Sequence, residues 1–577
     1  MKERIGELLR FIYGEKRGEE TANRLLELAE EEGESIEAPS YRGTGELPLS
    51  QEDAFLITYG DSLEPEGAPP LEGLRDFARE KLEDSVSGIH ILPFFPYSSD
   101  DGFSIIDYYE VNPELGTWKE VSEIGSTFKL MSDLVLNHCS SQNEWFRKFL
   151  AGEPGYENFF IAVDPETDLS SIVRPRTHPL LTPYESSRGT LHVWTTFSAD
   201  QVDLNFAEPA VLLEMVRVLL YHIRRGIQVI RLDAIAYLWK EIGHPSIHHE
   251  KTHAVVKLFR TLLDKVAPWV VIITETNVPH EENVSYFGNY RDEAHMVYQF
   301  PLPPLTLDAF LREDARRLAG WASNLPDTGG RTTFFNFLAS HDGIGLLPAQ
   351  GILSRGEIDG LVRAAGERGG FINYKATPEG KIPYEMNITY LDAVAEKDLN
   401  ESVRARKFLA SQAVMLSVPG VPGIYVHSLL GSGNYREGVE KTGQNRTINR
   451  EKLNYREVLE EINTPGTLRN RIFSGYTSML NARKTHKAFH PSGTMEVVHK
   501  DHRIFSLLRV SEDKSERVIC IINVSSQVVT FELPFDVLKT GVKSSFTEII
   551  GGETVSAEVG THSLRFQIQP YGVYWLS

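Results

Sequence analysis

Eight short apolar runs, separated by stretches long enough to form helices, constrain the fold of this chain more than any other feature. In order they are AFLITYG (54–60), GIHILPFF (88–95), FKLMSDLVLNH (128–138), QVIRLDAI (228–235), VVIITET (270–276), HMVYQFPL (295–302), TTFFNFLASHD (332–342) and VPGIYVHSLL (421–430). Near-continuous apolar runs are typical of strands buried on both faces of a parallel sheet. Amphipathic patterns such as PAVLLEMVRVLLYHIRRG lie between them. Eight such units predict an α/β fold, a (β/α)8 TIM barrel built from residues 51–138, 208–342 and 401–494.

The remaining segments are too long, or too different in pattern, to be simple connections between those strands. Residues 1–50 predict a helical lead-in. Residues 139–207 predict an inserted domain after the third strand, and residues 343–400 a smaller insertion after the seventh. We expect both on the C-terminal face of the barrel, where active-site loops lie. From 495 to 577 short β runs follow one another without helices, which predicts an all-β C-terminal domain.

Charge and composition exclude several classes of function. The formal charge is −21 at pH 7, which argues against a nucleic-acid partner because phosphate backbones are bound by clustered Lys and Arg. No apolar run is long enough to predict a membrane span, and the amphipathic start MKERIGELLRFIYGEKRGEE does not resemble a signal peptide. Cys139 follows the end of a predicted strand and Cys520 lies in a distant β run, so these two cysteines do not suggest a disulfide framework. We therefore expect a reducing, cytoplasmic compartment. The sequence leaves open whether the chain is a monomer or a homodimer.

Polar and charged side chains stand at the ends of four of the predicted strands. They are Asp133, Asn137 and His138 in the third run, Arg231 and Asp233 in the fourth, Glu275 in the fifth, and His341 and Asp342 in the seventh. Taken singly, each motif also has a structural interpretation as a helix cap, a solvated strand end or an ion pair. Because the C-terminal ends of barrel strands meet in one pocket, the joint pattern predicts an active site with three carboxylates.

Three carboxylates beside an arginine suit the cleavage of a glycosidic bond with retention. That reaction needs a nucleophilic carboxylate and, about 5–5.5 Å away, a second carboxyl group that acts as acid and then as base. The nucleophile must be ionised, and Arg231, two residues before Asp233 on the same strand face, is expected to lower its pKa. The acid must keep its proton, so we expect drier or more anionic surroundings for Glu275.

At these residues the sequence resembles the α-amylase-type family of (β/α)8 enzymes. DLVLNH, IRLDAI, ITETN and FLASHD are similar to its four signature regions, in the same order. The resemblance implies that Asp233 is the nucleophile, Glu275 the acid/base and Asp342 the transition-state stabiliser. The residues that we expect to contact the sugar are His138, Arg231, Tyr237 and His341.

Longer motifs resemble the sucrose phosphorylase branch of that family. LPFFPYSSDDGFSIIDYYEV is similar to a loop whose acidic residue, here Asp100, closes the glucose subsite. RPRTHPLLTPY and VWTTFSADQVDLNF imply Arg176 at a phosphate site and Phe197 beside the glucose ring. PYEMNITYLDA resembles a mobile loop and implies a phosphate contact for Tyr384. The implied substrates are a small sugar and inorganic phosphate, handled by a hexosyl phosphorylase of the glycosyltransferase type.

The acceptor is implied by a departure from the sucrose phosphorylase pattern. Sucrose phosphorylases carry Glu-x-His at the fifth strand, whereas Asn277 stands here in the position of the histidine, on the acceptor side. ENFFIAVDPETDLS, DEAHMVYQFPLPP and FNFLASHDGIG resemble glucosylglycerate phosphorylases instead. The resemblance implies reversible phosphorolysis of 2-O-α-D-glucosyl-D-glycerate to α-D-glucose 1-phosphate and D-glycerate. A carboxylate acceptor needs a cation, for which Arg176, Arg446 and Arg450 are candidates; structural salt bridges are the alternative for the last two.

Several alternatives remain open at this point. Phosphorolysis of sucrose or sucrose 6-phosphate is the runner-up, hydrolysis comes third, and a non-catalytic amylase-like binding scaffold is the remote alternative. The double-displacement scheme requires no cofactor and no metal. The histidine-rich stretch HPSIHHEKTH (244–253) does not have metal-ligand spacing, and we interpret it as surface or loop histidines.

Overall fold

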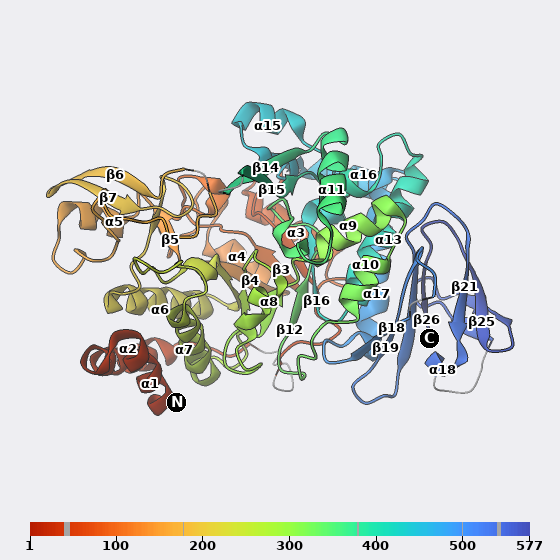
Figure 1. The fold of residues 1–577 in the computed structure, drawn as a ribbon, viewed down its shortest axis with the longest axis horizontal. Helices are drawn as coiled ribbons and strands as arrows, with labels where there is room; N and C mark the ends of the chain where they lie inside the picture. The colour runs from red at the N-terminus through yellow and green to blue at the C-terminus, as the bar shows by residue number, and fades with distance from the viewer. Residues whose placement is uncertain (40–46, 177, 378–379, 499, 539–543) are drawn as a thin grey trace.

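Eight parallel strands close into a barrel at the centre of the chain (Figure 1). The computed structural model describes all residues of 1–577 except 40–46, 177, 378–379, 499 and 539–543. In spatial order the strands are β1 (Phe55–Thr58), β16 (Val421–Tyr425), β12 (Thr333–Asn336), β11 (Met296–Tyr298), β10 (Val271–Thr274), β9 (Ile227–Asp233), β4 (Lys129–Val135) and β3 (Gly88–Ile91). The predicted (β/α)8 barrel is confirmed.

Each strand is shorter than the apolar run that predicted it. Pro93 and Pro301 lie within their runs, where proline removes a donor and restricts the preceding residue, so pairing stops before them. The end of the run that contains β11 instead begins α9 (Leu302–Arg312), and the end of the last run forms α14 (Val426–Leu429). Asp233 is therefore the last residue of its strand, and Asn137, His138, Glu275, His341 and Asp342 lie beyond their strand ends, whereas Asp133 and Arg231 lie two positions before the ends of β4 and β9.

The helices of the barrel pack on the strands through apolar faces. They include α3 (Pro70–Lys81), α4 (Trp118–Gly125), α6 (Pro209–Arg224), α7 (Glu250–Val266), α10 (Arg316–Ala322), α13 (Glu401–Ser417) and α17 (Leu468–Thr485). Helix α6 illustrates the cause: proline at its first position suits the helix start, and Leu212, Val216 and Leu219 repeat at helical spacing and are buried. The hairpin of α1 (Lys2–Tyr13) and α2 (Glu15–Gly33) packs against α6 and α7.

Two long segments follow the C-terminal ends of β4 and β12. The first contains β5 (His138–Ser140), α5 (Glu144–Ala151), β6 (Leu181–Ser186), β7 (Gly189–Trp194) and β8 (Gln201–Asp203). The second contains β13 (Ile344–Gly345), α11 (Arg355–Glu367), β14 (Phe371–Thr377), β15 (Gly380–Asn387) and α12 (Tyr390–Val394). Figure 1 shows both along the upper side of the molecule. They cover the barrel end at which the predicted site residues lie.

The C-terminal part is built from β strands, as predicted, and adds one short helix, α18 (Phe535–Leu538). The strands β18 (Thr494–Val497), β19 (Ile504–Val510), β20 (Arg517–Asn523) and β26 (Val573–Leu576) form one sheet. A second sheet holds β21 (Val529–Pro534), β25 (Ser563–Ile568) and β24 (Glu558–Val559), and an apolar cluster fills the space between them. Among the described residues, no helix combines the length and the apolar character that a membrane crossing requires.

Candidate active site

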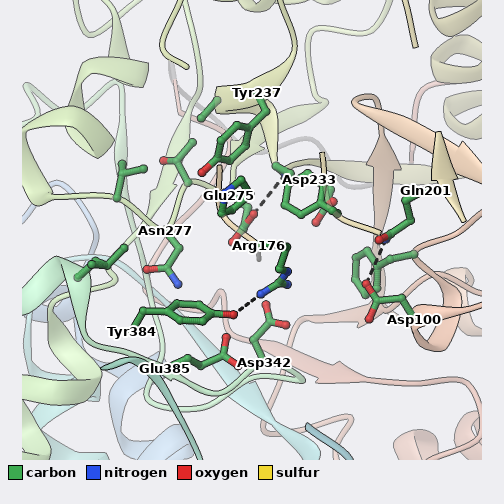
Figure 2. Close-up of a pocket in the computed structure, with 18 of the residues that line it drawn as sticks. Asp100, Arg176, Gln201, Asp233, Tyr237, Glu275, Asn277, Asp342, Tyr384 and Glu385 are labelled. Carbon is green, nitrogen blue, oxygen red and sulfur yellow. Dashed lines mark hydrogen bonds between the residues drawn. The ribbon is translucent and has the colours of Figure 1, made fainter. Parts of the chain in front are cut away.

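A pocket of about 930 Å³, partly open to solvent, lies at the C-terminal end of the barrel (Figure 2). Barrel strand ends and both long segments contribute side chains to it. The polar and charged residues that line it are Asp100, His138, Arg176, Gln201, Asp233, Tyr237, Glu275, Thr276, Asn277, His341, Asp342, Lys375, Tyr384, Glu385 and Arg446. Aromatic walls come from Phe103 and Phe197.

Arg231 holds two carboxyl groups at the floor of this pocket. It is 2% exposed and lies beside Asp133 in the register of β4 and β9. Its Nη1 donates to Asp133 and, at 2.7 Å, to Oδ1 of Asp233, the last residue of β9. Its Nη2 lies 3.8 Å from Oε2 of Glu275, which directly follows β10. One buried guanidinium therefore reaches both carboxyl groups that line the pocket here.

Burial and mutual repulsion act on the Asp233–Glu275 pair. Burial and the charge of Glu275 raise the pKa of Asp233, although Arg231 opposes both. Burial and the charge of Asp342 raise the pKa of Glu275, and Arg231 again opposes. The expectation of a raised pKa for Glu275 agrees with this. Arg231 does lower the pKa of Asp233, as expected, but burial outweighs the cation, so the net shift is upward. The negative charge on either group therefore disfavours ionisation of the other, and the two titrate as a pair.

Arg446 forms an ion pair with the third carboxylate, that of Asp342. Its Nη1 lies 2.6 Å from Oδ1 of Asp342, and its Nη2 donates to Oε2 of the buried Glu385 at 2.7 Å. Burial alone would raise the pKa of Asp342, but Arg446 and His341 together hold it well below its usual range. Asp342 is thus a permanent anion in the pocket, unlike the Asp233–Glu275 pair.

Asp100, His138 and Gln201 form a hydrogen-bonded group on one wall. Nε2 of Gln201 donates to Oδ2 of Asp100 at 3.1 Å and lies 3.1 Å from Nε2 of His138. Asp100 has φ +54°, a left-handed conformation that aspartate adopts more readily than most residues, and the hydrogen bond from Gln201 fixes its carboxyl group. The ring of Phe197 packs 5.2 Å from His138 and 5.5 Å from Tyr237. On the barrel floor His341 stacks on Phe103 at 4.8 Å.

The two long segments meet through Arg176 and Tyr384. Arg176 donates a hydrogen bond to the Tyr384 hydroxyl, and the guanidinium lies 5.9 Å from the centre of that ring. Burial raises the pKa of the Tyr384 hydroxyl, so it remains a neutral donor. Figure 2 shows both side chains pointing into the cavity that Asp233 and Glu275 also face.

Comparisons with known proteins agree with this architecture. Residues 82–328 match the family described as the alpha amylase catalytic domain, and residues 495–575 match the maltogenic amylase C-terminal domain. The glucosylglycerate phosphorylase of Spirochaeta thermophila is 55% identical over all of this chain and 98% of its own length. The chain belongs to the glucosylglycerate phosphorylase family, within the α-amylase family.

More distant relatives support the same fold. A sucrose phosphorylase of Streptococcus mutans is 27% identical over 83% of this chain and 98% of its own length. The crystal structure of sucrose 6F-phosphate phosphorylase from Thermoanaerobacter thermosaccharolyticum matches with a TM-score of 0.74 at 23% identity, over 91% of this chain and all of that one. The glucosylglycerate phosphorylase family thus shares its architecture with the sucrose phosphorylase branch that the motifs had indicated.

Most residues predicted from the motifs of this family lie together in the pocket. Those that line it are Asp100, His138, Arg176, Phe197, Asp233, Tyr237, Glu275, Asn277, His341, Asp342 and Tyr384. Arg231 lies beneath the pocket and acts on it through its partners. Arg450, expected as a substrate contact, does not line the pocket: its Nε donates to the His341 carbonyl at 2.8 Å and its Nη1 to Asp101 at 2.5 Å. Arg446, the neighbouring candidate, does line it.

The sequence reasoning missed Phe103, Gln201, Lys375 and Glu385. Gln201 lies within the quoted motif VWTTFSADQVDLNF and could have been found there. Phe103 and Glu385 likewise lie within the quoted motifs LPFFPYSSDDGFSIIDYYEV and PYEMNITYLDA. Lys375 lies outside every quoted motif, so no signal pointed to it.

The histidine-rich stretch 244–253 lies outside the pocket. His248, His249 and His253 pair with Glu282, Glu241 and Glu293 at 2.8–3.1 Å. Within the described ranges of the chain, no group of three or more His, Cys, Asp or Glu residues is arranged to hold a metal ion.

Proposed function

We propose that the chain is a retaining glucoside phosphorylase that catalyses the reversible phosphorolysis of 2-O-α-D-glucosyl-D-glycerate to α-D-glucose 1-phosphate and D-glycerate. The observation that carries this proposal is the meeting of Arg176 and Tyr384 in the pocket that Asp233 and Glu275 line. A cation and a neutral donor beside a carboxyl pair suit an anionic nucleophile and an anionic leaving group. The name of the 55% identical relative supports the same substrate.

In the first half-reaction Asp233 attacks C1 of the glucosyl group. The bond from C1 to O2 of glycerate breaks, Glu275 gives its proton to that oxygen, and a β-glucosyl ester of Asp233 forms. One guanidinium that reaches both carboxyl groups, at 2.7 and 3.8 Å, is compatible with the separation of about 5–5.5 Å that retaining chemistry uses.

In the second half-reaction phosphate replaces glycerate beside Arg176 and Tyr384. A phosphate oxygen attacks C1 from the side that glycerate left, the bond from C1 to Asp233 breaks, and Glu275 takes up the proton of the attacking phosphate. Two inversions yield α-D-glucose 1-phosphate with retained configuration.

The proton of the carboxyl pair belongs on Glu275 in this scheme. Arg231 donates directly to Asp233 at 2.7 Å but lies 3.8 Å from Glu275, so it favours the anion on Asp233. The raised pKa of Glu275 favours the protonated form that the leaving group requires.

The remaining residues would bind the glucosyl ring. We assign hydroxyl contacts to Asp100, His138, Gln201, His341, Asp342 and Arg446, and ring contacts to Phe197 and Tyr237. Residues 139–207 and 343–400 would be the insertions that exclude water from the glucosyl ester, since they supply Arg176 and Tyr384. Residues 1–50 and 495–577 would serve as a helical lead-in and a β domain without a part in the chemistry.

One assay tests the proposal. The protein is incubated with inorganic phosphate and one of three sugars: 2-O-α-D-glucosyl-D-glycerate, sucrose or sucrose 6-phosphate. The α-D-glucose 1-phosphate and free glucose formed are measured, and binding of each sugar is followed by calorimetry. Product from the glucosylglycerate alone is the expected result. Product from sucrose or sucrose 6-phosphate alone would mean that the acceptor is not glycerate. Release of free glucose would indicate a hydrolase. Tight sugar binding without turnover would indicate a binding scaffold.

Two further expectations belong to this proposal. A reducing, cytoplasmic compartment is supported by Cys139 and Cys520, which are both buried and free. A homodimer stays a prediction, and light scattering of the purified protein would distinguish it from a monomer.

A further inference from the structure

Lys375, on strand β14, lines the pocket beside the residues of the proposed reaction. We propose that Lys375 binds the anionic group of the acceptor together with Arg176, the phosphate in one half-reaction and the glycerate carboxylate in the other. Lys375 would then be a specificity-determining residue for anionic acceptors. This inference rests on the proposed function, which supplies the two anions.

The β14–β15 hairpin aims Lys375 into the pocket. Asn373 pairs with Glu385 across the hairpin, and its Nδ2 donates to Oε1 of Glu385 at 3.1 Å, so the two side chains share a face. Lys375 is two residues beyond Asn373 and therefore lies on that same face.

A register shift in the same hairpin brings a further side chain into the cavity. Tyr374 pairs with Pro383 and Asn373 with Glu385, which leaves Tyr384 as the extra residue of a β-bulge. A bulge lets consecutive side chains point the same way, and Tyr384 and Glu385 both line the pocket. The hairpin therefore presents the phenol that binds Arg176 and the ammonium of Lys375 to the same cavity.

The charges of the pocket leave Lys375 available to a ligand. Five carboxyl groups and three Lys or Arg side chains line it. Arg446 is engaged by Asp342 and Glu385. Within the part of the chain that the structure describes, Arg176 and Lys375 are the two cations of the lining without an ion pair to a carboxylate. An anionic acceptor must overcome the field of the carboxyl groups, and two cations at its binding position supply the compensating charge.

The alternative is a solvated lysine on a surface hairpin, and the same hairpin offers the matched control. Lys381 pairs with Ala376, the neighbour of Lys375, so its side chain lies on the opposite face of the hairpin, and it is exposed. Lys375→Gln and Lys381→Gln remove the same charge from opposite faces of one element. Lys375→Arg keeps the charge and serves as the rescue variant.

The experiment separates glucosyl transfer from anion binding. Fluoride release from α-D-glucosyl fluoride reports formation of the glucosyl ester, and saturation with phosphate or D-glycerate reports the acceptor. We expect Lys375→Gln to raise the KM for both anions about 10- to 100-fold. Release of fluoride without an acceptor should change less than about twofold. Lys375→Arg should recover most of the affinity, and Lys381→Gln should behave as the unmodified protein.

Calorimetric titration with inorganic phosphate provides a second measurement that needs no turnover, in which Lys375→Gln should weaken binding by a similar factor. Unchanged anion affinity in Lys375→Gln, or an equal loss in Lys381→Gln, would overturn the inference. Should the unmodified protein release fluoride while neither anion saturates the reaction, the proposed function itself would fail. That result is distinct from an anion-dependent enzyme that is indifferent to Lys375.

Discussion

Arg231 donates a hydrogen bond of 2.7 Å to Asp233, the carboxyl group two residues further along the same strand. The alternation of side chains along β9 puts both on one face, and the guanidinium is almost fully buried. A buried arginine needs compensating carboxylates, and here they are Asp133 on the neighbouring strand and the Asp233–Glu275 pair. The ion pairs thus orient the proposed nucleophile before substrate arrives.

The first prediction concerns Asp233 itself. Asp233→Ala should lower kcat by about 10⁴-fold, because no other carboxyl group can form the glucosyl ester. The fold should persist, because Asp133 still compensates Arg231. Turnover with α-D-glucosyl fluoride and circular dichroism together check this. Substantial residual phosphorolysis in a folded variant would remove Asp233 as the nucleophile.

The second prediction is a bell-shaped dependence of kcat/KM on pH. The active form holds one proton on the carboxyl pair. As pH rises through the raised pKa of Glu275, the acid is lost and the rate falls; as pH falls, the pair takes up a second proton and Asp233 ceases to be a nucleophile. In Glu275→Gln the alkaline limb should disappear for α-D-glucosyl fluoride, whose leaving group needs little help from an acid. An unchanged alkaline limb would assign that limb to another group.

A third prediction concerns phosphate. Arg176→Ala should raise the KM for phosphate about 10- to 100-fold, because a charge-assisted contact is lost, and should change the inhibition constant of glucose less than about twofold. Arg174→Ala is the matched control, since Arg174 is half-buried two residues earlier and does not line the pocket. Equal losses of phosphate and glucose binding in Arg176→Ala would mean that the residue is structural.

The catalytic end of the barrel was predictable because strand ends in a parallel barrel converge. Apolar runs predicted the strands, and Asp233, Glu275 and Asp342 then had to meet at one end. The degree of burial could not be predicted from the sequence in the same way, so the net upward shift in the pKa of Asp233 was not expected. Charge partners can be guessed from spacing, but the loss of water around a carboxyl group depends on packing from the whole barrel.

The loops that surround the pocket were less predictable than the barrel strands. Arg446 and Arg450 are four residues apart around the short 3₁₀ helix Asn445–Asn449, and the path of that turn decides that Arg446 enters the pocket while Arg450 binds the His341 carbonyl. Lys375 lies on the pocket side through the register of one hairpin, and Tyr384 and Glu385 both line the pocket because of the bulge in its second strand, and no residue pattern reveals either feature.

A fourth prediction separates stability from function at Arg446. Arg446→Met should lower the free energy of unfolding by about 2–3 kcal/mol, because Glu385 is left buried without its cation. Adding Glu385→Gln should restore most of that stability in urea unfolding, since the orphaned charge is gone. Activity should not return, because Asp342 still lacks the cation that keeps it ionised. Recovery of kcat in the double variant would show that Arg446 acts on Glu385 alone.

The last prediction concerns buried histidines far from the chemistry. Burial lowers the pKa of His222 to about 4 and that of His427 to about 3, and it lowers that of His295 well below the usual range. The unfolded chain protonates such residues near pH 6.5, so below that pH it binds more protons than the folded chain and stability falls, by about 1.4 kcal/mol per pH unit for each histidine. His222→Gln should reduce the slope of unfolding free energy between pH 5 and 6.5 by one proton, whereas His562→Gln, at an exposed position, should leave it unchanged. Equal slopes in both variants would mean that His222 stays charged in the folded protein.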